Sequence, residues 1–305
     1  MPHIWQGGIS IRREKKCLDM KIKEKIVPFL IVIFGLILLA YPFISNYVFE
    51  KSASSKVHSY EQKADTMDQE KINRMFQEAK KYNDDLRKSL VQMTDPFKLK
   101  QKNGENLEYQ KILDIDGNGI MGYVKIPCIS VELPVYHGTS AEVLEHGVGH
   151  LAASSFPIGG KSTHSVLTGH TGLSSARLFT DLTQMKEGDL FFIHVLDRDL
   201  AYKVDQIVVV KPEDTTKLQI VQGKDYVTLV TCTPYGVNDH RLLVRGVRTR
   251  YEKKQEEKKS RNRESQWMSV YKRAVLIGLT IVFGIVLTAK MIRRMKERNL
   301  KGDRE

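Results

Sequence analysis

The chain has 305 residues, and its 48 Lys and Arg against 36 Asp and Glu leave a formal net charge of +12. Hydrophobic residues make up 41% of it, which is typical of folded proteins and excludes a wholly disordered or collagen-like chain. Cys17, Cys128 and Cys232 are too few and too scattered for a disulfide scaffold or a CxxC site. A cysteine with a chemical role would therefore act as a single thiol.

Two apolar runs frame the chain and are long enough to cross a membrane. Residues 26–44 carry no charge, and at the rise of an α-helix they span roughly 28 Å, about one bilayer core. Residues 274–289 are also uncharged and span roughly 24 Å. We predict a transmembrane helix at each run.

A cleaved signal peptide is the alternative interpretation of the first run. The apolar part of a signal peptide has about 7 to 15 residues and ends at a small-x-small cleavage site. Residues 26–44 form a longer run, and Tyr41-Pro42-Phe43 is a poor cleavage site. These features favour an uncleaved anchor.

Basic residues flank both runs and predict the topology. Lys and Arg are frequent in residues 1–25 and 290–305, so the positive-inside rule places both ends in the cytoplasm and the region between the runs outside the cell. Residues 251–273 are basic too, but their many Glu and Gln predict a solvated stalk. We therefore expect a two-pass protein of the cell membrane.

The charge distribution also bears on binding partners. The basic residues concentrate at the membrane flanks and in the predicted stalk, and no nucleic-acid-binding motif accompanies them. We interpret them as topology signals and as contacts with anionic membrane lipid, and we expect no nucleic-acid partner.

Residues 45–91 are predicted to form a helical neck after the first span. Residues 50–91 lack Gly and Pro, and apolar residues recur in the second half of this stretch at helical spacing. The stripe comprises Ile72, Met75, Phe76, Ala79, Tyr82, Leu86 and Leu90. Residues 94–97 end the helix, because Pro96 lacks a backbone donor and restricts the residue before it.

The chain beyond the neck is polar, and we predict a loop across residues 98–117. Residues 114–119 match the opening D-x-[DN]-x-[DN]-G of a calcium-binding EF-hand loop. The twelfth position of such a loop would be Lys125, where a bidentate Glu is required. We therefore predict a turn here and no metal site.

Residues 120–250 carry the signals of a strand-rich domain. β-rich runs bounded by turn residues lie at residues 121–127, 129–135, 165–167, 190–196, 201–210, 226–231 and 241–247. One helix is predicted at residues 174–185. Many short strands with few helices and no βαβ alternation predict an antiparallel barrel or sandwich.

Two cysteines lie in the predicted outward region, and their settings differ. Cys128 falls within a β-rich run between Ile126 and Ile129, where a cysteine acts as a small apolar residue. Cys232 follows the run 226–231 and precedes a turn, where a side chain can be presented. A disulfide between the two cysteines stays open, because the sequence does not show whether they are close.

A catalytic thiol needs a base or a positive neighbour, because at a pKa of about 8.5 only a few per cent is thiolate at neutral pH. His170 follows the run 165–167 and a glycine, which places it at a strand end. Arg241 opens another β-rich run, and its charged fork of donors can hold a carbonyl or a developing oxyanion. Cys232, His170 and Arg241 are therefore the candidate catalytic residues.

Three stretches resemble the motifs of class C sortases, the pilin-polymerising transpeptidases of Gram-positive bacteria. Residues 228–246 read TLVTCTPYGVNDHRLLVRG, close to the signature around the family's catalytic cysteine and arginine. Residues 167–172 (LTGHTG) are similar to its catalytic-histidine motif, and residues 122–138 are similar to its first strands. The resemblance covers about residues 90–250.

This resemblance implies an eight-stranded sortase β-barrel over residues 105–250, which needs no cofactor. It implies that Cys232 is the nucleophile, His170 the general acid and base, and Arg241 the group that steadies the substrate and oxyanion. The implied reaction is cleavage of the Thr-Gly bond of an LPxTG-like sorting signal through a thioacyl intermediate. The acyl group then passes to a lysine of the next pilin.

The resemblance also implies a lid over the active site. Asp95-Pro96-Phe97 matches the Asp-Pro-aromatic motif of that lid, with Phe where many members have Trp. We expect residues 92–104 to form the lid, with Asp95 paired to Arg241 and Phe97 covering Cys232.

Two other functions are open at this point. A housekeeping-type sortase would attach surface proteins to peptidoglycan and would differ only in its acceptor. A non-enzymatic adhesion or scaffold module on the cell surface would keep Cys232 as a structural residue. The second predicted span and the lid motif favour the pilin-polymerising enzyme.

Overall fold

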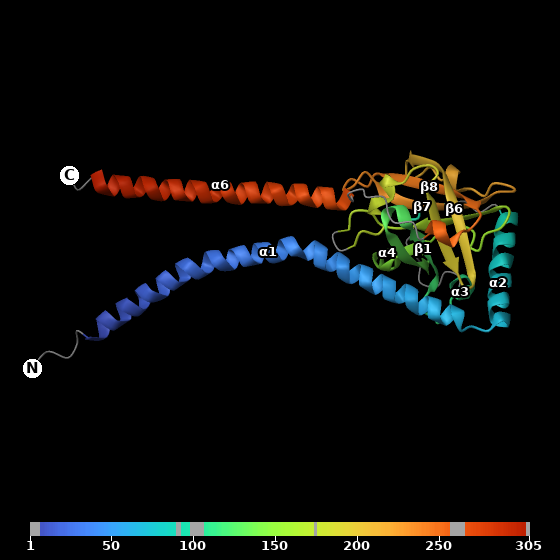
Figure 1. Ribbon diagram of the computed structural model, residues 1–305, viewed down its shortest axis with the longest axis horizontal. Coiled ribbons are helices and arrows are strands. Elements are labelled where there is room, and N and C mark those ends of the chain that lie inside the picture. The colour runs from blue at the N-terminus through green and yellow to red at the C-terminus, as the bar shows by residue number, and fades with distance from the viewer. Residues whose placement is uncertain (1–6, 90–92, 98–106, 174–175, 257–265, 303–305) are drawn as a thin grey trace, which may run out of the picture.

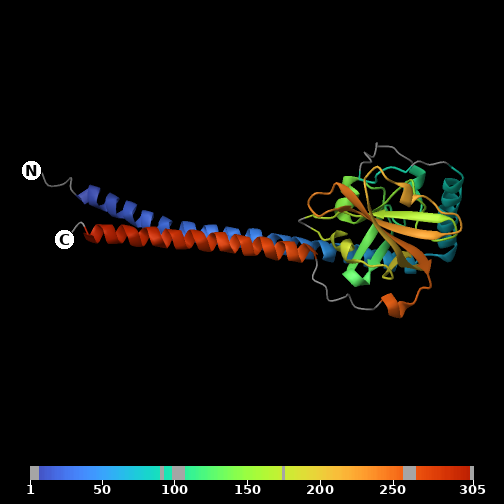
Figure 2. The ribbon, with the colours of Figure 1, turned by 90° about the horizontal axis from the view of Figure 1, so that it is seen from above.

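The computed structural model describes residues 7–89, 93–97, 107–173, 176–256 and 266–302. A barrel of strands lies at one end of the molecule. Two long helices, α1 (Gly7–Asp65) and α6 (Gln266–Gly302), extend from it in the same direction, so both termini lie at the far end (Figures 1 and 2). The helix α2 (Gln69–Lys88) covers the opposite end of the barrel (Figure 1).

Eight strands close into the barrel in the order β1-β2-β3-β4-β7-β8-β6-β5. They are β1 (Ile120–Ile126), β2 (Val131–His137), β3 (Val148–His150), β4 (Thr163–Thr168), β5 (Leu190–Val195), β6 (Arg198–Val210), β7 (Asp225–Thr233) and β8 (His240–Thr249). The short helices are α3 (Leu107–Lys111), η1 (Pro127–Ile129), α4 (Ala141–His146), η2 (Thr180–Gln184), η3 (Thr216–Leu218) and α5 (Lys253–Glu256). The seven predicted strands and the closed eight-stranded barrel are confirmed, whereas the three-residue strand β3 was missed.

The strand directions differ from the expectation of an antiparallel sheet. The pairs β2–β3 and β4–β7 are parallel, and the other neighbours are antiparallel. Parallel neighbours need a crossover connection. The helix α4 lies in the connection from β2 to β3, and β5 and β6 lie in the connection from β4 to β7. The antiparallel prediction was therefore wrong for two of the pairs.

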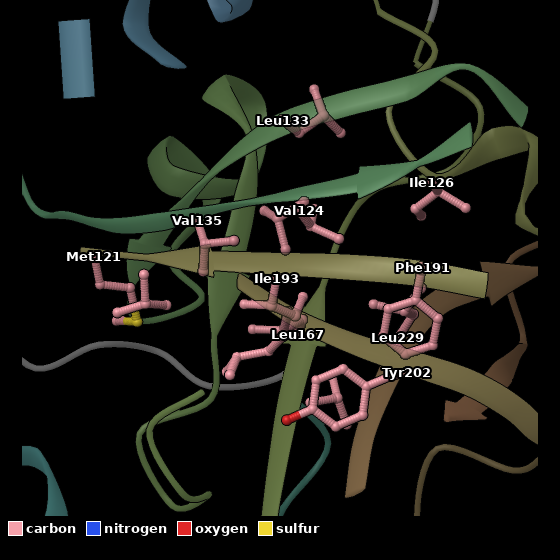
Figure 3. Close-up of a cluster of buried hydrophobic side chains, with 14 of the residues drawn as sticks. Met121, Val124, Ile126, Leu133, Val135, Leu167, Phe191, Ile193, Tyr202 and Leu229 are labelled. Atoms are coloured by element: carbon pink, nitrogen blue, oxygen red, sulfur yellow. The ribbon is translucent and has the colours of Figure 1, made fainter. Parts of the chain in front are cut away.

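Apolar side chains from the strands fill the barrel (Figure 3). The labelled core residues are Met121, Val124, Ile126, Leu133, Val135, Leu167, Phe191, Ile193, Tyr202 and Leu229. The rings of Phe191 and Tyr202 stack at 5.6 Å. A Cβ on Gly246 of β8 would lie 2.5 Å from the Phe191 ring, so only glycine fits at this point of the wall.

The predicted neck is two helices rather than one. The helix α1 continues without a break from the apolar run and packs Ala53, Val57, Tyr60 and Ala64 against the barrel, at the spacing of one helix face. It ends at Asp65, and Asp68 then caps α2 by accepting hydrogen bonds from the backbone N–H of Glu70 (3.1 Å) and of Lys71 (3.4 Å). The capping carboxylate starts a new helix in another direction.

The predicted apolar stripe of α2 packs on the barrel. Its members Ile72, Met75, Phe76 and Ala79 are buried, Tyr82 and Leu86 are half-buried, and Leu90 lies outside the described residues. Asn83 adds two hydrogen bonds with the backbone of Phe156, at 3.2 and 2.7 Å. The prediction of an amphipathic helix is confirmed for this part of the neck.

Three local predictions need correction. The helix predicted at 174–185 is reduced to the 3₁₀ turn η2 in the described part, because Leu178 adopts a left-handed φ of 41°. The loop predicted at 98–117 contains the helix α3, while residues 98–106 lie outside the described chain. Cys128 lies in η1, between strands rather than within one.

The segment 114–119 is a turn, as predicted. The Asp114 carboxylate accepts hydrogen bonds from the backbone N–H of Asp116 (3.4 Å), Gly117 (2.9 Å) and Gly119 (3.3 Å). Gly117 and Gly119 have φ values of 78° and 72°. This geometry requires glycine, which accounts for the sequence pattern without reference to calcium.

Within the described residues, one helix is long and apolar enough to cross a membrane, namely α1, with the stretch Ile33–Asp65. Membrane anchors and signal sequences share this length and composition. Residues 274–289 are helical within α6, as predicted, and their large apolar side chains Leu276, Ile277 and Phe283 are exposed.

Candidate active site

The antiparallel pair β7–β8 brings two of the candidate residues together. Cys232 lies one residue before the end of β7, Arg241 is the second residue of β8, and the two are direct partners in the strand register. The connection between them turns back because Asn238 adopts a left-handed φ of 61°, with the N–H of Val237 donating to the Pro234 carbonyl at 3.1 Å. The TCTPYG motif is therefore a strand end followed by a tight turn.

The parallel pair β4–β7 places the histidine. Thr168 of β4 is level with Val230 of β7, so continuing this register by two residues brings His170 level with Cys232. Two hydrogen bonds extend the pairing beyond the strand, from the Gly169 N–H to the Val230 carbonyl (3.0 Å) and from the Thr231 hydroxyl to the Gly169 carbonyl (2.7 Å). Cys232 and Arg241 thus lie on the neighbouring strands β7 and β8, and His170 lies two residues beyond the end of β4, the other neighbour of β7.

Arg241 is fixed by two sets of hydrogen bonds. Its Nε and Nη2 donate to the two carboxylate oxygens of Asp95, at 2.9 and 2.8 Å. Its Nη1 donates to the backbone carbonyls of Asn238 (3.1 Å) and His240 (3.0 Å). Arg241 is 8% exposed and Asp95 is 6% exposed, so this is a buried bidentate ion pair.

Phe97 lies between the arginine and the histidine. The Arg241 guanidinium is 4.8 Å from the centre of the Phe97 ring, and the His170 and Phe97 rings are 5.7 Å apart. Phe97 also packs on an apolar cluster that includes Met93 and Leu218, and the Thr215 hydroxyl donates to the Met93 carbonyl at 3.2 Å. The described segment 93–97 is therefore held at Met93, Asp95 and Phe97.

Burial sets the protonation of the two titratable groups. Burial raises the pKa of the Cys232 thiol; the charge of Arg241 opposes this, and the carboxylate of Asp95 adds to it. Burial also lowers the pKa of His170, against the opposing charge of Glu145. Both shifts favour the uncharged forms, which are the protonated thiol and the neutral imidazole.

The structure brings together all five site residues that the sequence predicts. Asp95 pairs with Arg241 as expected, and no disulfide joins Cys128 and Cys232. Sequence reasoning missed the anchoring of the segment by Met93 and Thr215. These residues lie 122 positions apart, and neither stands in a recognisable motif.

Comparisons with known proteins agree with this geometry. A model of the sortase domain matches residues 124–249. The solved sortase C-1 of Streptococcus pneumoniae is 46% identical over 65% of this chain and 100% of its own, with a TM-score of 0.61. Sortase C1 of Streptococcus agalactiae is 48% identical over 65% of this chain and 100% of its own, with a TM-score of 0.59.

A more distant relative is sortase A of Bacillus anthracis, which is 26% identical over 72% of this chain and 92% of its own length. The solved sortases C are more similar to this chain and align along almost their whole length. The chain therefore belongs to the sortase family of cysteine transpeptidases.

Proposed function

We propose that this protein is a membrane-anchored class C sortase that joins pilin subunits. The observation that carries the proposal is the strand register that sets Cys232 opposite Arg241 and pairs β4 with β7 up to two residues before His170. A solved relative that is 42% identical is described as a pilus-related sortase C of Group B Streptococcus. The proposed substrates are pilins with an LPxTG-like sorting signal and an acceptor lysine.

The first half-reaction forms a thioester on Cys232. The Sγ attacks the Thr carbonyl carbon of the sorting signal, and its proton passes to His170. The Arg241 guanidinium stabilises the developing oxyanion, because a fixed positive donor in a buried site needs no reorganisation during the reaction. The Thr-Gly bond then breaks, and His170 gives its proton to the departing glycine amine.

The second half-reaction releases the acyl group. The uncharged amine of a pilin lysine attacks the thioester carbonyl, and His170 takes up a proton from the attacking nitrogen. The carbon–sulfur bond breaks, and His170 passes this proton to the departing Cys232 sulfur, which restores the thiol and the neutral imidazole. An isopeptide bond between two pilins results, and repetition lengthens the polymer.

The segment 93–97 acts as the lid in this proposal. Asp95 occupies the Nε and Nη2 donors of Arg241, and Phe97 lies against His170. A substrate that uses these donors must displace Asp95. Arg241 would then keep its bonds to the Asn238 and His240 carbonyls, so the guanidinium stays in place when the lid leaves.

The membrane topology is also part of the proposal. The helix α1 serves as the anchor, α6 as a second span, and both termini are cytoplasmic. The rings of Phe43 in α1 and Tyr271 in α6 meet edge to face at 4.4 Å, which supports entry of the two helices into the membrane side by side. Anionic lipid would contact the basic flanks.

A housekeeping-type sortase is the second candidate, because the curated relatives include sortase A proteins. The two candidates differ in the amine that resolves the thioester. The adhesion or scaffold alternative lacks support, because the family consists of transpeptidases.

The test uses the full chain in detergent with a pilin that carries its sorting signal. We expect a ladder of covalent pilin oligomers, no ladder with Cys232→Ala, and an unchanged ladder with the control Cys128→Ala. A ladder that persists in Cys232→Ala would refute the assignment. A product formed only with a peptidoglycan-type amine would support the housekeeping function instead.

A further inference from the structure

The loop that carries His170 is tied to the helix that enters the membrane. Asn46 lies in α1, two positions beyond the predicted span 26–44, and its Oδ1 accepts a hydrogen bond from the backbone N–H of Arg177 at 2.9 Å. Asn46 is only 9% exposed, whereas its neighbour Tyr47 is 65% exposed. The polar side chain therefore faces the catalytic domain rather than solvent.

A small polar network continues from this contact. The Asn46 Nδ2 donates to Glu50 Oε1 at 3.0 Å, and the same carboxylate oxygen lies 3.8 Å from the Arg177 guanidinium. Arg177 also forms an ion pair with Asp181, which is 2% exposed, and Gln184 donates to the other Asp181 oxygen at 3.0 Å. A buried carboxylate needs such partners, so Arg177 is held firmly.

The segment after Arg177 fixes the backbone on both sides of His170. The Phe179 N–H donates to the His170 carbonyl at 3.0 Å, and the Gly172 N–H donates to the Thr180 hydroxyl at 3.2 Å. The Phe179 ring is fully buried, and a Cβ on Gly169 would lie 2.7 Å from it. A shift of this segment would therefore displace the imidazole.

The helix α1 is a rigid support for this network. It runs unbroken from the apolar run to Asp65, and Ala53, Val57 and Tyr60 pack against the barrel. The Tyr60 hydroxyl donates to the Met121 carbonyl and accepts from the Leu196 N–H, both at 3.0 Å. No loop separates the apolar run from the part of α1 that contacts Arg177.

We infer that Asn46 is a positioning residue, through which the membrane helix α1 forms part of the scaffold that holds His170. The chain of contacts runs from Asn46 to Arg177, then to Phe179 and His170. The expected effect of Asn46 on the rate of acyl transfer rests on the proposed function. The expected effect of Asn46 on the position of the His170 imidazole rests on the structure alone.

The test compares Asn46→Ala with the control Ser54→Ala in the full chain, reconstituted in detergent micelles. Ser54 is exposed on the same helix, so its substitution removes a hydroxyl without touching the network. With a sorting-signal peptide, we expect the kcat for thioester formation to fall about tenfold in Asn46→Ala, with KM changed by less than about twofold. Ser54→Ala should match the unsubstituted protein.

A second readout needs no substrate. We expect NMR titration of the His170 imidazole to show its pKa moving upward toward the ordinary value in Asn46→Ala, because a looser loop admits water to the ring. The double substitution Asn46→Asp with Glu50→Gln exchanges the amide donor at residue 46 and the carboxylate acceptor at residue 50. It keeps an oxygen at residue 46 that accepts from the Arg177 N–H. We expect this variant to show the kcat and the His170 titration of the unsubstituted protein.

The outcomes separate this inference from the proposed function. If the unsubstituted protein forms no thioester with a sorting peptide, the proposed function fails and the titration still decides the role of Asn46. If folded Asn46→Ala titrates and reacts like Ser54→Ala, the inference is overturned. Failure of the double substitution to restore the titration would also contradict it, since the acceptor would be present without effect.

Discussion

Two peripheral segments contact the same barrel through buried carboxylates, and the two carboxylates differ in the number of side chains that hold them. On one side Asp95 pairs with Arg241 of β8, at the candidate active site. On another side Glu256 of α5 contacts His194 of β5. The first segment leads out of α2, and the second leads toward α6.

The Glu256 site is crowded with partners. Its carboxylate lies 3.0 Å from the ammonium of Lys125, accepts a hydrogen bond from Tyr251 at 2.7 Å, and is 3.4 Å from His194 Nε2. His194 also bonds to Asp199 at 2.7 Å and stacks on Tyr123 at 4.3 Å. Release of Glu256 would remove one partner from each of Lys125, Tyr251 and His194.

The Asp95 site is arranged for exchange. Within the described chain, the ion pair of Asp95 is with Arg241, and the arginine has its own backbone acceptors at Asn238 and His240. In the proposed mechanism a substrate replaces Asp95 while these backbone acceptors keep the guanidinium in place. The comparison shows the structural difference on which the proposed exchange depends: the partner of Asp95 has acceptors of its own, whereas several groups share the carboxylate of Glu256.

The largest expected effect tests the role of the imidazole. We expect His170→Gln to slow thioester formation by about 10²- to 10⁴-fold, because the glycine amine then leaves without a proton donor. Rapid-quench measurement with a sorting-signal peptide checks this. The control His146→Gln changes an exposed histidine of α4 and should react at the original rate. Equal rates for the two variants would exclude His170 from the chemistry.

The next largest effect tests the paired guanidinium donors of Arg241. We expect Arg241→Lys to lower kcat/KM by about 10²-fold, because a lysine supplies charge without the paired donors. Arg245→Lys is the matched control, since Arg245 lies on the same strand and forms a similar bidentate pair with Asp205. Steady-state kinetics on both variants decides whether the loss is specific to the site, and a similar loss in both would contradict the assignment.

A smaller effect distinguishes the contact of Asp95 from that of Glu256. Asp95→Ala should speed thiol labelling of Cys232 by about tenfold, because it opens the cover and removes a charge that raises the pKa of the thiol. Phe97→Ala should also speed labelling. Glu256→Ala should leave the labelling rate unchanged. If Asp95→Ala labels no faster than Glu256→Ala, the segment 93–97 is not a lid.

The smallest effect concerns stability against pH. The partners of His194 raise its pKa from 6.5 to about 9, although burial opposes this. The contribution of His194 to the free energy of unfolding is therefore complete below about pH 6.5 and is lost as the pH rises through about 9. Burial raises the pKa of Glu256, but His194, Tyr251 and Lys125 lower it by more, to about 2. The contribution of Glu256 to the stability of the fold is therefore lost only as the pH falls toward 2.

The corresponding variant is His194→Gln. We expect it to reduce the free energy of unfolding by about 1 kcal/mol at pH 6.5 and to flatten the decline between pH 6.5 and 9. The value is modest because the partner Asp199 has a side chain that is 48% exposed. Urea unfolding across this pH range is the measurement, and an unaltered pH dependence would show that His194 is not the titrating group.

Much of the site could be predicted because its signals are local. Cys232 and Arg241 stand at the ends of two β-rich runs, and that local pattern was enough to name both as candidates before the structure paired them. The motif resemblance supplied the pairing of Asp95 with Arg241, which lies 146 residues away. The buried stripe of α2 also followed from helical spacing.

Contacts between distant segments could not be predicted. The parallel pairing of β4 with β7 depends on the crossover between them, and nothing local marks its direction. Asn46 and Arg177 lie 131 residues apart, and Glu256 falls in a segment whose charges predicted a solvated stalk. Tertiary packing decides such cases, and Leu178 shows the same effect, since its buried side chain and left-handed φ prevent the predicted helix.

The most direct test of the account is mass spectrometry of the full chain after mixing with a sorting-signal peptide. The account predicts one covalent adduct, with the mass of the acyl fragment that ends at threonine, and peptide mapping should place it on Cys232. An adduct on another residue, or none at all while the peptide is cleaved, would contradict the claim that Cys232 carries the acyl group.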